Sequence, residues 1–127
     1  MNEATIAAKL LTLFASGGTL ERVVADLPKF KAQIESAYGW MKTAGRCTDT
    51  EVRERAERLG ELVRQKDGAV RHGDIDLAAK LRAEECSLFG SFGMEAPEGE
   101  AWHTILRVGI DEQTKSLSEL LYDIDAA

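Results

Sequence analysis

The 127-residue sequence has little cysteine and no long apolar run. Its two cysteines, Cys47 and Cys86, are too few for a disulfide framework and lie on different predicted elements, which favours a reducing, cytoplasmic setting. The N-terminus lacks the basic start of a signal peptide. The apolar stretch that follows, residues 6–16, contains Lys9 and is too short to span a bilayer. We therefore expect a soluble protein without a membrane segment.

Sustained two-residue alternation, the pattern of a β-strand, is also missing, apart from a weak ambiguity over residues 104–110. Glycines and one proline instead divide the sequence into segments whose apolar residues recur at helical spacing. This pattern predicts an all-α fold, a compact bundle of about five to six helices built from helical hairpins. The length fits one domain, 1–127, with a core that needs no disulfide to hold it.

Caps and breakers place the expected helices. Thr19 and Asp74 each precede an apolar-periodic segment, and Thr48 with Glu51 forms a capping box. Gly45 is expected to end the third helix. The expected ranges are 3–15, 20–27, 28–44, 50–72, 75–89 and about 97–124. A central hairpin, 50–89, joins the fourth and fifth helices, and the last helix is the longest.

The central hairpin has an apolar seam with one charged interruption. On the fourth helix the seam runs to Val70 and is interrupted by Lys66, and on the fifth it includes Ile75 and Cys86. Arginines on the fourth helix are interleaved with glutamates, which predicts a solvated face stabilised by pairs one turn apart. These pairs are Glu51–Arg55, Glu54–Arg58 and Arg53–Glu57.

Residues 59–89 are the most informative segment. One helix ends near His72-Gly73, and the next begins directly after Asp74, so a turn of one or two residues forces the two helices antiparallel. The small pair Ala78-Ala79 lets their backbones approach closely.

This hairpin resembles the UVR motif, which is found in the UvrB and UvrC repair proteins and in some Clp-type ATPases and their adaptors. Ile75 and Asp76 are conservative departures from the motif, and Ala83 replaces its acidic residue. The resemblance implies a protein–protein contact module, because hairpins of that family pair with hairpins on partner chains, and it implies no catalysis. The matching residues are Asp74, Ala78, Ala79, Leu81 and Arg82.

The negative charge is concentrated at one end of the chain. The formal net charge is −6. Residues 1–93 carry 14 acidic and 14 basic side chains, whereas residues 94–127 carry 8 acidic and 2 basic ones, which accounts for the whole excess. This balance disfavours direct binding to nucleic acid, which needs clustered cations. It leaves an acidic face for a basic partner.

Three groups of residues could form a metal site, a reactive thiol or a phosphate-binding loop, but each has a simpler structural explanation. His72, Asp74 and Asp76 offer metal ligands, but Asp74 fits a helix cap and His72 a helix C-terminus. Cys47 follows Arg46 near a helix N-terminus, an arrangement that can lower a thiol pKa, but no base can be assigned to it. The stretch 16–19 lacks the strand and lysine of a phosphate-binding loop and fits a helix-to-helix turn.

The sequence therefore predicts a non-enzymatic protein–protein interaction module, an adaptor or regulator that acts on a larger protein. One alternative is an inhibitor of a host defence enzyme encoded by a phage or mobile element, and another is a small metal- or thiol-dependent enzyme. No catalytic residue, metal ligand or cofactor is assigned, and a homodimer stays open. In the loop after the hairpin, glycine-spaced aromatic residues either form a contact surface or close the core. The expected partner contacts are Phe89, Phe92, Met94, Arg82, Glu112, Glu119 and Asp123.

Overall fold

Helices account for all the regular secondary structure in the described part of the chain. The computed structural model describes residues 3–97 and 101–126, with side chains left out at 101–108 and 125–126. Within these ranges no residue lies in a strand, which confirms the all-α prediction. The elements are α1 (Glu3–Ala15), α2 (Leu20–Asp26), the short 3-10 helix η1 (Pro28–Phe30), α3 (Lys31–Gly45), α4 (Asp49–Arg71), α5 (Ile75–Gly90) and α6 (Ala101–Ala126).

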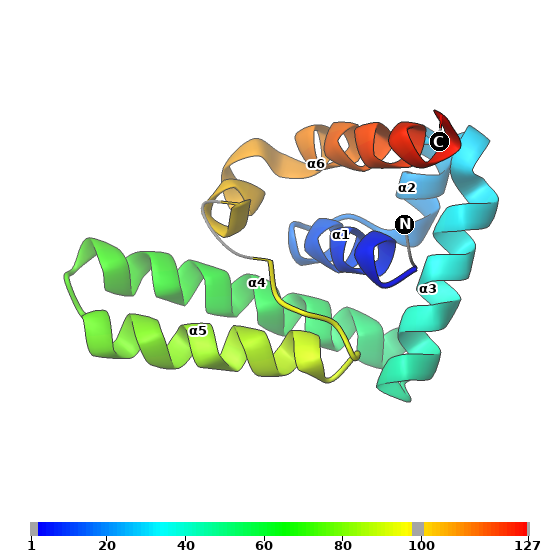
Figure 1. Cartoon of the computed structure of the whole chain (residues 1–127). Helices are drawn as coiled ribbons and strands as arrows, with labels where there is room; N and C mark the ends of the chain where they lie inside the picture. Colours follow the sequence, from blue (N-terminus) through cyan, green and yellow to red (C-terminus); the bar gives the residue numbers. More distant parts are fainter. Residues whose placement is uncertain (1–2, 98–100, 127) are drawn as a thin grey trace.

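Helix α1 occupies the centre of the fold. Figure 1 shows it between α6 and the α4–α5 pair, with α3 crossing one end, and it packs against α3, α4 and α6. Its apolar residues surround most of the helix, so it can be covered from several sides. The residues of α1 that are buried in the main core are Ile6, Ala7, Leu10, Leu11, Leu13 and Ala15.

The predicted caps are present. The Thr19 hydroxyl accepts a hydrogen bond from the Arg22 N–H, and Thr48 and Glu51 form the complete capping box. The Asp74 carboxylate accepts a 3.1 Å hydrogen bond from the Leu77 N–H at the start of α5. Local sequence therefore fixes where these three helices begin.

The end of α3 differs from the expectation. Gly45 remains helical, and the left-handed residue is Arg46, with a φ of 49°. A Cβ atom at Gly45 would lie 2.6 Å from Cδ1 of Phe92, so this glycine admits the Phe92 ring. Pro28 also opens the short turn η1 rather than α3 itself. Tertiary packing decides both details.

Helices α4 and α5 form an antiparallel hairpin whose closed end projects beyond the other helices (Figure 1). Gly73 makes the turn with a φ of 72°. Inside the hairpin, Leu62, Ala69 and Leu81 are buried in a small core of their own. The base of the hairpin joins the main core through Leu59, Val63 and Phe89.

The last helix is not the uninterrupted helix that the sequence predicts. Pro97 lies in the preceding loop, and Gly109, with φ 69° and ψ −172°, breaks α6. Beyond the break, Leu117 and Leu121 are buried as expected. None of the helices described is long and apolar enough to cross a membrane.

Candidate functional site

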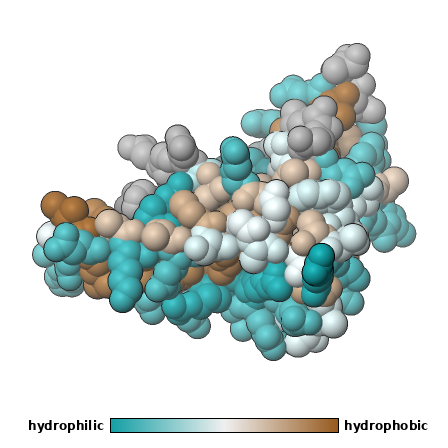
Figure 2. Space-filling view, turned by 60° about the horizontal axis from the view of Figure 1, so that its bottom comes forward, coloured by the Kyte–Doolittle hydropathy of each residue, from teal (hydrophilic) through white to brown (hydrophobic). Residues whose placement is uncertain are grey.

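The closed end of the hairpin exposes large apolar side chains. Val70 is 55% exposed, Ile75 78% and Leu77 43%, and we call these three residues the hairpin tip. In the described part of the chain, Tyr122 is the fourth large apolar side chain that is exposed to this degree. Figure 2 shows the hydrophobic colour gathered at the projecting end of the hairpin. Three of the four large exposed apolar side chains in the described part of the chain therefore lie at the hairpin tip.

The sequence assigns Val70, Ile75 and Cys86 to the apolar seam, and this expectation is wrong because all three are exposed. Val70 and Ile75 flank a short turn, where neither helix extends far enough to cover the other. Ala69, which is adjacent to Val70, is buried, and Leu81 is buried further along α5. Apolar residues next to a short turn at the end of a protruding hairpin are the pattern that could have identified the tip.

The tip is held rigidly by its own backbone. The Asp74 N–H donates a 2.8 Å hydrogen bond to the Ala69 carbonyl, and the Gly73 N–H donates one of 3.1 Å to the Val70 carbonyl. Together with the Asp74 cap, these bonds satisfy the end of α4 and the start of α5. The apolar side chains therefore stand on a fixed support and need little ordering to meet a partner.

An ionic cluster lies deeper in the seam. Lys66 Nζ donates a hydrogen bond of 2.9 Å to Glu85 Oε2, and Glu85 is completely buried. Arg82 contacts the same oxygen at 3.3 Å and donates a second hydrogen bond, of 3.0 Å, to the Pro97 carbonyl. Arg82, an expected partner contact, is thus engaged within the chain and ties the loop after α5 to the hairpin.

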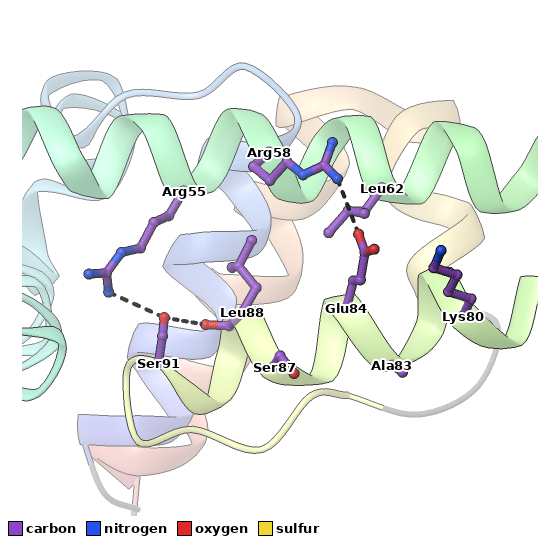
Figure 3. Close-up of a pocket in the computed structure, with 9 residues that line it drawn as sticks. All are labelled: Arg55, Arg58, Leu62, Lys80, Ala83, Glu84, Ser87, Leu88 and Ser91. Carbon is purple, nitrogen blue, oxygen red and sulfur yellow. Dashed lines mark hydrogen bonds and ion pairs between the residues drawn. The ribbon is translucent and has the colours of Figure 1, made fainter.

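A shallow groove of about 550 Å³ runs along one side of the hairpin (Figure 3). We call it the lateral groove. Arg58 of α4 spans it, with its guanidinium 3.1 Å from Glu84 Oε2 on α5. At one end Arg55 donates a 3.2 Å hydrogen bond to the Ser91 hydroxyl. The groove is lined by Arg55, Arg58, Leu62, Lys80, Ala83, Glu84, Ser87, Leu88 and Ser91.

The arginines of α4 make tertiary contacts. Arg55 also donates to the Gly45 carbonyl at 3.2 Å and lies over the Phe92 ring at 4.7 Å. The three glutamate–arginine pairs expected within α4 do not form in the described structure. Arg55 instead reaches Gly45 of α3 and Ser91 after α5, and Arg58 pairs both with Glu61 on its own helix and with Glu84 on α5.

The aromatic loop after α5 closes the core. Phe89 and Phe92 are fully buried, and Met94 is 6% exposed. The expectation that they contact a partner is therefore wrong, and the alternative, that they pack under the hairpin, is correct. The backbone turns back after α5, with hydrogen bonds from Phe92 and Met94 N–H to the Phe89 carbonyl. This turn directs the rings inward, over the space that Gly45 leaves open.

The acidic residues that are expected to contact a partner lie on α6 and not on the hairpin. Glu112, Glu119 and Asp123 are all exposed on α6. Their spacing of seven and four residues places them on one side of that helix. The hairpin tip lies at the projecting end of α4 and α5, away from the C-terminal part of α6 (Figure 1). The structure therefore does not join these carboxylates and the hairpin tip into one surface.

Cys47 and the group of His72, Asp74 and Asp76 lie at opposite ends of α4. Burial raises the pKa of the Cys47 thiol, outweighing the nearby Arg55 guanidinium, so the lowered thiol pKa that this arrangement could have produced is not present. His72, Asp74 and Asp76 are exposed, and no cluster of three potential metal ligands occurs in the described ranges. Side chains in the part of α6 that includes His103 lie outside the described residues.

A polar contact joins α3 to the start of α4. The Tyr38 hydroxyl donates a 2.6 Å hydrogen bond to Asp49 Oδ1, and Lys42 Nζ lies 3.1 Å from the same oxygen. The bonds from Tyr38 and Lys42 lower the pKa of Asp49. Burial, and then the hydrogen bond to Asp49, raise the pKa of Tyr38 well above its ordinary value. This contact fixes the corner between α3 and α4.

Comparison with known proteins gives no relative. No family model, no curated protein and no solved structure matches this chain.

Proposed function

We propose that this chain is a non-enzymatic protein–protein interaction module that engages a larger protein through the hairpin tip. The observation that carries the proposal is the exposure of Val70, Ile75 and Leu77 on a rigid, projecting turn. Exposed apolar side chains that cluster in this way mark contact surfaces. A partner with a complementary apolar pocket would remove all three from water together.

Burial of the hairpin tip against a partner would contribute favourably to binding. Complete burial of a valine, leucine or isoleucine side chain contributes about 1.5–3 kcal/mol. At the tip between two fifths and four fifths of each side chain is exposed, so a large part of this contribution is still available. The backbone is already fixed by the Asp74 cap, which lowers the entropic cost of binding.

The resemblance to the UVR motif supports the same proposal. In this chain Asp74 caps α5, Ala78 packs in the seam and Leu81 is buried there. These motif residues form the cap and the buried seam of the hairpin, and they leave the hairpin tip exposed. The two free cysteines favour a reducing environment, and we place the module in the cytoplasm.

The test uses a photo-crosslinking amino acid at position 75 of the full chain, introduced in the native cell. Position 25, which is exposed on α2, is the control. We expect one partner protein to crosslink from position 75 and not from position 25. That partner is then purified, and its affinity for the chain is measured by calorimetry.

Substitutions test whether the affinity for the partner depends on the hairpin tip rather than on other exposed apolar side chains. An I75S/L77S chain should bind the purified partner at least about tenfold more weakly, a loss of roughly 1.4 kcal/mol. The matched control is Y122S, which removes an exposed large side chain from α6 and should leave the affinity unchanged. Full affinity in I75S/L77S would contradict the proposal, as would crosslinking only to a second copy of this chain.

A further inference from the structure

We propose that the lateral groove binds an acidic amphipathic helix of the partner protein. This inference rests on the proposed function and adds the chemistry of the partner. The groove lies between two antiparallel helices, α4 and α5, and side chains from both line it (Figure 3). The furrow between two packed helices is the surface on which a third helix packs.

The dimensions of the groove suit a helix of about three turns. Along α5 and its C-cap residue the lining extends from Lys80 to Ser91, which is roughly 16 Å along the helix axis at about 1.5 Å per residue. The side chains that face a partner are small at Ala83 and Ser87, and both residues are exposed. A helix can therefore approach the α5 backbone closely between the two ends.

The floor of the groove is apolar. Leu62 is almost completely buried at its base, and Leu88 is partly buried beside it. Apolar side chains near the middle of a partner helix would cover Leu88 and fill the space over Ala83. The apolar face of the partner therefore belongs at the centre of the contact.

Each end of the groove carries a cation that has no carboxylate partner among the described residues. Arg58 is balanced by Glu84 and Glu61. By contrast, Arg55 donates only to a carbonyl and a hydroxyl, and Lys80 forms no ion pair with any described residue. In Figure 3 these two side chains stand at opposite ends of the groove.

This distribution specifies the charge pattern of the partner. A helix lying along α5 should carry one carboxylate near each end, about eleven residues or three turns apart, with apolar residues between them. Charge complementarity of this kind sets orientation and register. The hairpin tip, which is apolar, would meet a different part of the same partner.

The probe is a synthetic helical peptide with two glutamates about eleven residues apart and two leucines between them on the same face. It is titrated into the full ¹⁵N-labelled chain, and amide chemical shifts are followed by NMR. We expect saturable shifts at Lys80, Ala83, Ser87 and Ser91. A peptide with lysines in place of the glutamates, and one with the glutamates moved to the opposite face, should bind several-fold more weakly or not at all.

Variants of the chain test whether the peptide binds in the lateral groove. A83W fills the groove and should abolish binding, whereas C86W places the same ring on another exposed face of α5 and should not. K80E should lower the peptide affinity about tenfold. Its matched control is K31E, an exposed charge reversal on α3, which should have no effect.

The inference is overturned if the acidic peptide causes no saturable shifts, if the lysine peptide binds equally well, or if A83W binds like the wild type. None of these results alters the crosslinking from position 75, because that assay reports the hairpin tip. Conversely, if I75S/L77S keeps full affinity for the purified partner while the acidic peptide binds the groove, the proposed function of the tip fails and the groove stands.

Discussion

Lys66 and Glu85 form a buried ion pair between α4 and α5, with 2.9 Å between Nζ and Oε2. The Glu85 side chain is fully buried and that of Lys66 is 10% exposed. Glu85 Oε1 accepts no hydrogen bond, so the carboxylate depends on the cations at its other oxygen. A buried charge is tolerated only when it is paired. This contact therefore holds the two helices of the hairpin in one register.

Removal of one partner of this pair should destabilise the chain strongly. We expect E85A to lower the free energy of unfolding by about 3–5 kcal/mol, because Lys66 is left buried without its carboxylate. The double variant K66M/E85L replaces the pair with apolar side chains and should recover most of the stability. Urea unfolding followed by circular dichroism measures both.

The control for this prediction is E84A on the same helix. Glu84 pairs with Arg58 at the surface, so its loss should change the free energy of unfolding by less than about 1 kcal/mol. Equal stability of E85A and E84A would show that the Lys66–Glu85 contact does not hold the hairpin.

Replacement of two glycines of α4 by alanine should change the free energy of unfolding in opposite directions. A Cβ atom at Gly60 would lie 2.8 Å from the Ala15 carbonyl oxygen, whereas one at Gly68 would meet no atom within 4 Å. We expect G60A to destabilise the fold by about 1–3 kcal/mol, since α1 and α4 must separate. We expect G68A to stabilise it by about 0.5–1 kcal/mol, because alanine is the better helix former. Urea unfolding of both variants checks this, and a stabilised G60A would show that α1 and α4 do not pack this closely.

The Tyr38–Asp49 hydrogen bond should make stability depend on pH at both extremes. The pKa of Asp49 is lowered in the folded state, so its contribution is present above about pH 4 and is lost as the pH falls further. The pKa of Tyr38 is raised, so the unfolded chain ionises first and the contribution of Tyr38 is lost as the pH rises above about 10.

The variant Y38F isolates this effect. Without the hydroxyl, the pKa of Asp49 should rise toward its ordinary value, and the alkaline loss of stability should shrink. Carboxyl ¹³C NMR reports the Asp49 titration directly, and unfolding at several pH values reports stability. Y122F is the control and should leave Asp49 unchanged. If Asp49 titrates at the same pH in the wild type and in Y38F, the hydrogen bond does not form in solution.

Much of the local structure of this chain follows from its sequence. Thr48 with Glu51 and Asp74 determine where α4 and α5 begin, because each cap satisfies backbone N–H groups a few residues away. Gly73 forces the turn between those helices for a similarly local reason. Helical periodicity then predicts an all-α fold, since the pattern of apolar residues already defines the faces to be buried.

The tertiary structure decides which apolar residues are covered. Phe92 is buried because Gly45, on a different helix, leaves space for its ring. Ile75 is exposed because the hairpin extends past every helix that could cover it. Lys66 interrupts the seam in the sequence, and only the fold shows that Glu85 lies opposite it. Periodicity assigns a residue to a face of its helix, but what lies against that face depends on segments distant in the chain.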